Sequence, residues 1–278
     1  MLPFTLQKIK MYKEHPVFIK PNNEDSKIWR YLDFPKFISL LDRKSLFFVR
    51  ASELCKVDPY EGHYTFVNIK KTIEKNNERN SKLREKYPQF FSKQNLNFNE
   101  ERTPLPLPLL KTVRMNTALN YWYLGEHETD AMWKLYSKNG EGIAIQSTFK
   151  RLKECFETCP EMVYIGMVQY IDYEKEEIPE DNLFYPFLHK RTNLKHECEL
   201  RALVQHLPED IMGEKIQLGK LEEPGVYIPI SLDNLIEKAY VAPTSPRWHL
   251  ELVENILNKY GLKKEVKQSI LSEPPPHE

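Results

Sequence analysis

The sequence lacks most of the short motifs that assign a chain to a known class of enzyme. Glycine occurs nine times in 278 residues, and no Gly-rich loop of the kind that holds phosphates is present. There is no Gly-x-Ser-x-Gly elbow, no His-x-x-x-His pair and no His-Glu-x-x-His motif. These absences argue against P-loop and dinucleotide-binding folds, serine hydrolases of the elbow type and zinc proteases.

Cysteine, net charge and long apolar runs are also scarce. Of the four cysteines, only Cys155 and Cys159 lie close together, and no second pair or histidine spacing completes a zinc site, so we expect no bound metal. The 40 basic and 40 acidic residues cancel, so no overall charge attracts nucleic acid or an anionic membrane. Without an apolar run long enough to span a bilayer, or a signal sequence in residues 1–20, we expect a cytoplasmic protein with no membrane partner.

Aromatic and β-branched residues are plentiful, and they define short strands mixed with short helices. The patterns predict strands over 28–32, 45–50, 111–124, 142–147, 163–173, 195–204, 226–230 and 240–242. They predict helices over 34–41, 66–87, 131–136, 184–191, 232–238 and 247–260, with Pro229 indicating an edge strand. Because there is no regular strand–helix–strand alternation, we expect an α+β fold with a mixed, mostly antiparallel sheet that could be split, and flanking short helices.

The expected organisation is one domain with additions. We expect an N-terminal arm over residues 1–26, a single α+β domain over 27–262 and a C-terminal tail over 263–278. Residues 66–108 form an insertion, a charged helix followed by a proline-rich loop over 88–108. From Lys70 to Lys86 the helix has seven Lys or Arg against three Glu; a solvated face is favoured over a nucleic-acid surface.

The stretch from Lys195 to Val204 is the strongest candidate for a site. Strand alternation places Glu197, Glu199 and Arg201 on one face, where three charges are costly if buried. Two carboxylates at this spacing can bind a sugar hydroxyl and stabilise an oxocarbenium-like centre at C1′ as nicotinamide leaves. Arg30 is the candidate cation for a pyrophosphate. The candidates for an aromatic slot that holds the nicotinamide are Trp122, Trp133 and Tyr136.

Over residues 27 to 260 the chain resembles the bacterial family known as domain of unknown function 2971. The residues that carry this likeness are Trp29-Arg30-Tyr31, Asp58-Pro59-Tyr60-Glu61, Met132 to Tyr136 with Gly140 and Gly142-Ile143, Val168-Gln169-Tyr170, and Glu197-Cys198-Glu199-Leu200-Arg201. Val57 stands where the family usually has Asn. The family name implies no activity.

A weaker resemblance is to mono-ADP-ribosyltransferases of the Arg–Ser–Glu class. Arg30, Ser147-Thr148 and Glu197-x-Glu199 occur in that order. The resemblance implies that Arg30 binds the phosphates and ribose of NAD, that Ser147 supports the site, that Glu199 binds the ribose hydroxyl and that Glu197 orients the acceptor. Ser52 is a rival for the serine role, and Tyr31 and Arg201 join the expected cofactor-binding residues. It implies an NAD-consuming transferase or glycohydrolase, a toxin or anti-phage defence effector with a nucleotide substrate and a macromolecular acceptor.

Two alternatives remain open. In the first, the chain is a binding module for a partner protein, and its charges form a structural network of Asp58, Glu61, Glu197, Glu199 and Arg201. In the second, the acidic residues bind Mg²⁺ and cleave phosphodiesters. The transferase hypothesis requires Arg30 and Glu199 to line one cleft.

Overall fold

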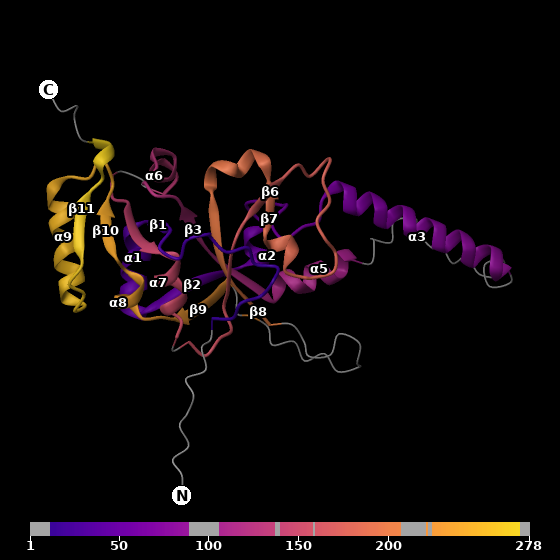
Figure 1. The fold of residues 1–278 in the computed structure, drawn as a ribbon, viewed down its shortest axis with the longest axis horizontal. Coiled ribbons are helices and arrows are strands. Elements are labelled where there is room, and N and C mark those ends of the chain that lie inside the picture. Colours follow the sequence, from indigo (N-terminus) through magenta and orange to yellow (C-terminus); the bar gives the residue numbers. More distant parts are fainter. Residues whose placement is uncertain are drawn as a thin grey trace, which may run out of the picture.

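The computed structural model describes residues 12–88, 106–136, 140–157, 159–206, 221 and 224–272. It confirms an α+β fold with a mixed, mostly antiparallel sheet (Figure 1). The longest run of paired strands has the order β11 (Glu265–Gln268), β10 (Lys238–Val241), β4 (Ile143–Thr148), β1 (Lys27–Leu32), β3 (Thr117–Leu124), β2 (Ser45–Arg50) and β9 (Gly225–Pro229). Pro229 therefore lies on an edge strand, where its missing N–H interrupts no ladder.

A branch leaves this run at β3. Strand β8 (Glu199–Gln205) pairs with the edge of β3 opposite to the one that β1 and β2 pair with. Strand β5 (Tyr164–Met167) pairs in turn with β8. Two short strands, β6 (Gln169–Ile171) and β7 (His189–Arg191), form a separate parallel pair. Only this pair and β10–β11 are parallel among the named strands of the described residues.

The sheet is split along one edge of β3. Strand β1 pairs with the end of β3, Trp29 opposite Tyr123, and β2 pairs with its start, Val49 opposite Leu119. Between these contacts, residues 120–122 have no strand partner on this edge among the described residues. Because both β1 and β2 diverge from β3, a gap opens there, and it contains the candidate site.

Local signals explain helix α1 (Phe34–Arg43), which follows β1. The side chain of Asp33 accepts a hydrogen bond from the Lys36 backbone N–H at 2.8 Å. Pro35 lies in the first turn, where a backbone N–H would have no partner within the helix, so the missing N–H of proline costs no hydrogen bond. Lys44 ends the helix in the left-handed region, with φ of 48°. The other α-helices of the described residues are α2 (Ala51–Leu54), α3 (Phe66–Lys86), α5 (Pro106–Met115), α6 (Asp130–Tyr136), α7 (Phe149–Glu154), α8 (Leu232–Leu235) and α9 (Arg247–Lys259). In the same ranges, 3₁₀ turns cover Tyr185–Phe187, Thr192–Glu197 and Ile270–Ser272.

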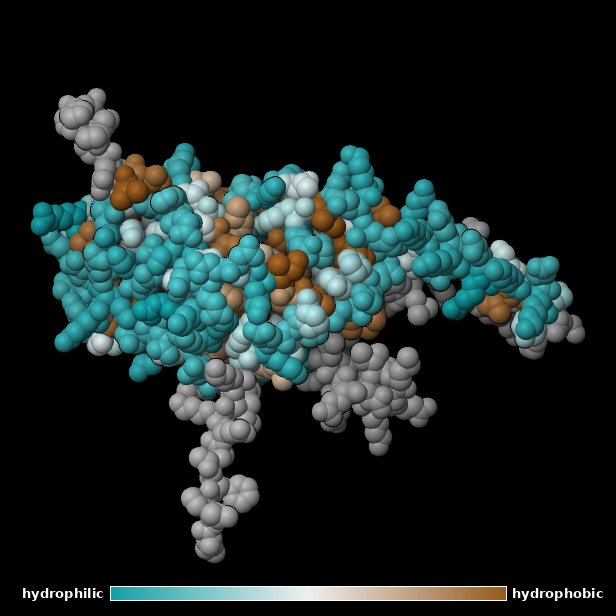
Figure 2. All heavy atoms as spheres, in the orientation of Figure 1, coloured by the Kyte–Doolittle hydropathy of each residue, from teal (hydrophilic) through white to brown (hydrophobic). Residues whose placement is uncertain are grey.

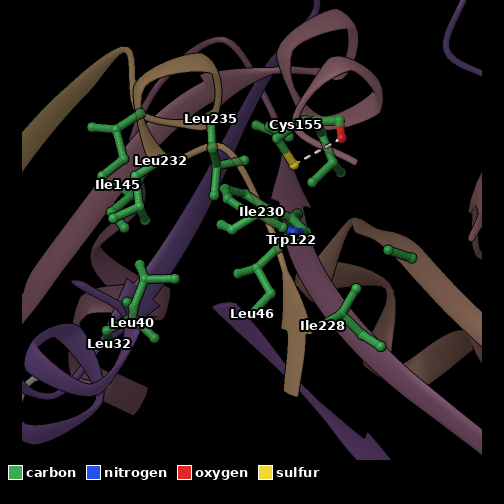
Figure 3. Close-up of a cluster of buried hydrophobic side chains, with 14 of the residues drawn as sticks. Leu32, Leu40, Leu46, Trp122, Ile145, Cys155, Ile228, Ile230, Leu232 and Leu235 are labelled. Carbon is green, nitrogen blue, oxygen red and sulfur yellow. Dashed lines mark hydrogen bonds between the residues drawn. The ribbon is translucent and has the colours of Figure 1, made fainter. Parts of the chain in front are cut away.

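The largest apolar core lies between the sheet and helices α1, α7, α8 and α9. Leu40 of α1 and Leu235 of α8 pack with Leu32, Leu46, Trp122 and Ile145 of the strands (Figure 3). A smaller cluster on α6 joins Met132 and Trp133 to aromatic residues of β1 and β10. The sheet is thus covered by different helices around the split.

Several sequence-based boundaries are wrong. Residues 184–191, expected to be helical, form a 3₁₀ turn and β7, and the strand expected over 163–173 breaks between β5 and β6. Residues 111–115 belong to α5, and the predicted loop over 88–108 contains the start of α5; its residues 89–105 lie outside the described residues. The expected tail contributes β11, because Val266 and its neighbours pair with β10.

Residues 12–19, within the expected N-terminal arm, run beside β5, and Glu24 and Ser26 contact the start of α7. The Met167 backbone N–H donates to the Ile19 carbonyl at 2.8 Å, and the ring of Phe18 stacks on that of Tyr164 at 5.3 Å. Val17 and Phe18 are buried. Among the described residues, no helix has the length and apolar character needed to cross a bilayer.

Candidate functional site

A cavity of about 810 Å³ opens at the split in the sheet. Its walls come from β1, α1, β2, α2, the turn at 57–61, β3, α6, β7, the turn ending at Glu197, β8, and β9. Arg30, Glu197 and Glu199 all line it. The cleft required by the transferase hypothesis is therefore present, and its volume is within the usual range for small-molecule sites, about 300–1,000 Å³.

Arg30 reaches into the split from β1. Strand alternation places it between Ile28 and Leu32, on the face of the main core, where a cation needs polar partners. Its Nη1 donates to the Tyr121 carbonyl at 2.6 Å and to Asn120 Oδ1 at 3.1 Å. Burial lowers the pKa of Arg30 to about 10, so it stays charged at neutral pH.

The guanidinium of Arg30 has no carboxylate partner within the described part of the chain. No ion pair of Arg30 is found there, and its Nε and Nη2 make no hydrogen bond to described residues. The Trp122 ring centroid lies 5.9 Å from its central carbon. Arg30 is therefore held in place by neutral groups and keeps donors for a ligand.

Asn120 is a site residue that sequence analysis missed. Its Nδ2 donates to the Phe47 carbonyl of β2 at 2.9 Å, and its Oδ1 accepts from Trp122 Nε1 at 2.9 Å and from Arg30. The side chain thus replaces missing backbone pairing between β3 and β2. An Asn inside an apolar strand, where this residue type is uncommon, was the available signal.

Lys190 of β7 joins the two candidate carboxylates. Its Nζ lies 2.8 Å from Glu199 Oε1 and also contacts Glu197 Oε2. The placement of Glu197 on a strand is wrong: it ends the 3₁₀ turn Thr192–Glu197, and β8 begins at Glu199. Cys198 between them has a positive φ of 38°, which turns the chain and brings both carboxylates to one amine.

The two carboxylates have opposite pKa shifts. Burial and a hydrogen bond with Glu199 raise the pKa of Glu197 above its ordinary value. Burial alone would raise the pKa of Glu199, but Arg201 and Lys190 outweigh it and hold that pKa at about 2. When the pKa values of two neighbouring carboxyl groups differ in this way, one group can remain ionised while the other exchanges a proton.

Arg201 lies beneath this pair and is fully buried. Its Nη1 and Nη2 donate to the two oxygens of Glu61 at 2.7 and 2.8 Å, and its Nε donates to Glu199 Oε2 at 2.6 Å. Nη1 also donates to the Phe187 carbonyl at 2.5 Å. Arg201 does not line the cavity, so its contacts support the site from below. Five residues, Glu61, Arg201, Glu199, Lys190 and Glu197, form the charge network of this site.

The other candidate residues divide between the cavity and the interior. Tyr31, Trp122, Tyr136, Asp58 and Glu61 line the cavity. Trp133, Ser147 and Ser52 do not.

The residues outside the cavity have buried positions of their own. Ser147 is buried and donates to the Leu235 carbonyl at 2.5 Å. The Trp133 indole donates to Glu128 at 2.6 Å, and the hydroxyl of Ser52 is buried without a hydrogen-bond partner among the described residues. The structure therefore places Arg30 and the carboxylate pair on the lining of one cavity, and it leaves both candidate serines outside that cavity.

Tyr121 is a second residue that the sequence did not single out. Its side chain lines the cavity, and its hydroxyl is buried without a hydrogen-bond partner in the described ranges. Burial, together with Glu61 and Glu199, raises the pKa of Tyr121 well above the usual value, so the hydroxyl keeps its proton. The described residues leave this buried donor unsatisfied.

Comparison with protein-family models, curated proteins and solved structures finds no match to this chain. Both family resemblances therefore stay predictions. Within the residues described, no three His, Cys, Asp or Glu side chains come together in a group that could hold a metal ion.

Proposed function

We propose that this protein consumes NAD as an ADP-ribosyltransferase-like enzyme, with a macromolecule or water as the acceptor. One observation carries the proposal: the Glu197–Glu199 pair lines the same cavity as Arg30, a cation without a carboxylate partner among the described residues. Following the resemblance, we extend the proposal to a toxin or anti-phage defence role.

Binding would use the two kinds of surface that meet in the cavity. Arg30 can donate its Nε and Nη2 hydrogens to a pyrophosphate, the charge-assisted contact for which guanidinium is suited. Tyr31 and Tyr136, whose rings stack at 6.4 Å, offer an aromatic wall for a planar base.

The chemistry would begin at Glu199. Its low pKa keeps it ionised at neutral pH, so it can accept a hydrogen bond from a ribose hydroxyl and stabilise positive charge developing at C1′. The bond between C1′ and the nicotinamide nitrogen breaks, and its electron pair leaves with nicotinamide, which departs neutral. The Lys190 and Arg201 contacts use two lone pairs of the carboxylate, which has about four acceptor sites.

Glu197 would handle the proton of the acceptor. As an acceptor oxygen or nitrogen forms its bond to C1′, it releases one proton, which Glu197 can take as general base. Its raised pKa brings it closer to neutral pH than an ordinary carboxyl, which improves the match for proton transfer. With water as acceptor, the products are ADP-ribose and nicotinamide.

The test is to incubate the purified full chain with NAD and to measure free nicotinamide by chromatography. Glu199→Gln removes the ionised carboxylate, and we expect the rate of nicotinamide release to fall at least about 100-fold, a typical loss for an electrostatic stabiliser. Glu237→Gln is the matched control, because Glu237 is also ion-paired, with Lys27 at 2.8 Å, and lies outside the cavity.

Binding is measured separately, because turnover could require an acceptor that is not in the assay. Saturating NAD should raise the melting temperature of the wild type and of the Glu237→Gln variant, and this shift should be lost in Arg30→Gln. If NAD neither shifts the melting temperature of the wild type nor releases nicotinamide, the proposal is refuted.

A second candidate is a binding module without turnover. Both oxygens of Glu199 are in ion pairs, and Glu61 binds Arg201 through both of its oxygens, so the network is complete without a substrate. Binding of ADP-ribose with no loss of NAD, in the presence of a cell extract as the source of acceptors, would favour this candidate.

A further inference from the structure

Helix α3 leaves the body of the protein after its first turn (Figure 1). Its start is fixed by Asn68, which is buried and donates through Nδ2 to the Ile178 carbonyl at 2.8 Å. Thr65 caps the helix by accepting from the Asn68 backbone N–H. Asn68 is the one buried residue of the helix, so most of its 21 residues are available to other molecules.

Five cations of α3 lie on one face. Lys71, Lys75, Arg79, Lys82 and Lys86 follow one another at intervals of three or four residues, so they form a single line along the helix, which we call the cationic stripe. At a rise of about 1.5 Å per residue the stripe is roughly 22 Å long, with a positive charge about every 6 Å. Figure 2 shows this arm as an almost wholly hydrophilic surface.

Most of the stripe makes no ion pair with the described residues, although Glu78 borders the same surface hollow as Lys75, Arg79, Lys82 and Lys86. Lys71 pairs with Glu177, whereas no ion pair joins Lys75, Arg79, Lys82 or Lys86 to any residue in the described part of the chain. These four are exposed. The glutamates of the helix follow their own line beside the stripe, so they leave one side of it open.

The charge of the molecule is also unevenly distributed. Helix α3 holds seven Lys or Arg and three Glu, a net charge of +4, and the whole chain is neutral, so the remainder carries −4. A neutral protein with its positive charge on a projecting arm presents a local field that the composition conceals.

We infer that the cationic stripe binds the phosphate backbone of a nucleic-acid duplex. The evenly spaced cations match a polyanion, and the apolar residues of α3 are too few to form the continuous stripe that a partner helix would need. Contact through Lys and Arg alone, without aromatic side chains between them, gives binding that is independent of sequence. The inference does not depend on the proposed NAD chemistry.

The test is fluorescence anisotropy of the full chain with a labelled 24-base-pair DNA duplex of arbitrary sequence. If the four free cations each contact a phosphate, the slope of log K against log salt should be about −3.6, and affinity should fall about 50-fold between 50 and 150 mM salt. In Lys75→Gln/Arg79→Gln, we expect weaker binding and a slope near −1.8, about a 7-fold fall.

The matched control removes the same charge from the opposite side of the helix. Lys70 and Arg84 lie about half a turn away from the stripe, so Lys70→Gln/Arg84→Gln should keep the slope of the wild type. Equal weakening by the two double variants would refute a directed surface. Absence of duplex binding at 50 mM salt would also refute the inference. Polyglutamate serves as a probe for an acidic protein surface, and binding of polyglutamate without binding of the duplex would indicate an acidic protein partner.

Discussion

Replacing Arg201 with Met should destabilise the fold strongly. Arg201 has no exposed surface, and Glu61, its bidentate partner, is 5% exposed. The substitution keeps most of the side-chain volume, so the main effect is electrostatic. Glu61 would lose its two Arg201 contacts, and Glu199 would keep Lys190 as its cation.

The expected magnitude follows from this burial. Removing one partner of a buried ion pair leaves an uncompensated charge and typically costs about 3–5 kcal/mol of unfolding free energy. The exposed pair Lys134–Asp130 is the control: its side chains are 76% and 61% exposed, so Lys134→Met should cost less than about 1 kcal/mol. Urea unfolding followed by tryptophan fluorescence measures both.

A double variant separates a lost charge partner from simple loss of packing. The double variant Glu61→Leu/Arg201→Met removes the carboxylate at position 61 together with its guanidinium partner, so no unpaired charge remains at that position. It should therefore be more stable than the sum of the two single losses predicts. A loss below about 1 kcal/mol for Arg201→Met, or strict additivity in the double variant, would refute the reasoning.

Three further predictions concern neighbouring features. Stability should fall as the pH drops from about 5 towards 2, because the pKa of Glu199 is depressed to about 2 in the folded state, and Glu199→Gln should flatten this part of a plot of unfolding free energy against pH. Ser147→Ala should leave nicotinamide release unchanged, because the hydroxyl lies outside the cavity; a large fall in kcat/KM would contradict this. Gly62→Ala should lower the unfolding free energy more than Gly261→Ala. Both glycines have a positive φ, so each substitution should cost about 1–3 kcal/mol of unfolding free energy. A Cβ at position 62 would also lie 2.4 Å from Phe187 Cε1, whereas a Cβ at position 261 meets nothing within 4 Å. Equal losses in urea unfolding would show that the clash is relieved.

The sequence by itself determined the elements whose signals are local. Helix α1 was predictable because its cap at Asp33, its first-turn proline and its apolar spacing all lie within ten residues. The same holds for α9, which is followed by Gly261 in the left-handed region, and for the strand class of β1 and β2. The α+β class followed because these local patterns alternate irregularly.

Only the tertiary structure decided what surrounds the charges. The pattern from Lys195 to Val204 suggested one continuous strand, but the positive φ of Cys198 turns the chain before Glu199. No local signal showed that Lys190, expected in a helix, would stand between Glu197 and Glu199.

The split in the sheet is the clearest case of a non-local decision. It depends on two strands, β1 and β2, competing for one edge of β3, and strand pairing depends on residues distant in sequence. Because of this gap Arg30 meets Asn120 and a cavity, where an unsplit sheet would have placed a neighbouring strand. The sequence named the charged residues of the candidate site, and the packing of distant strands decided which of them face one another.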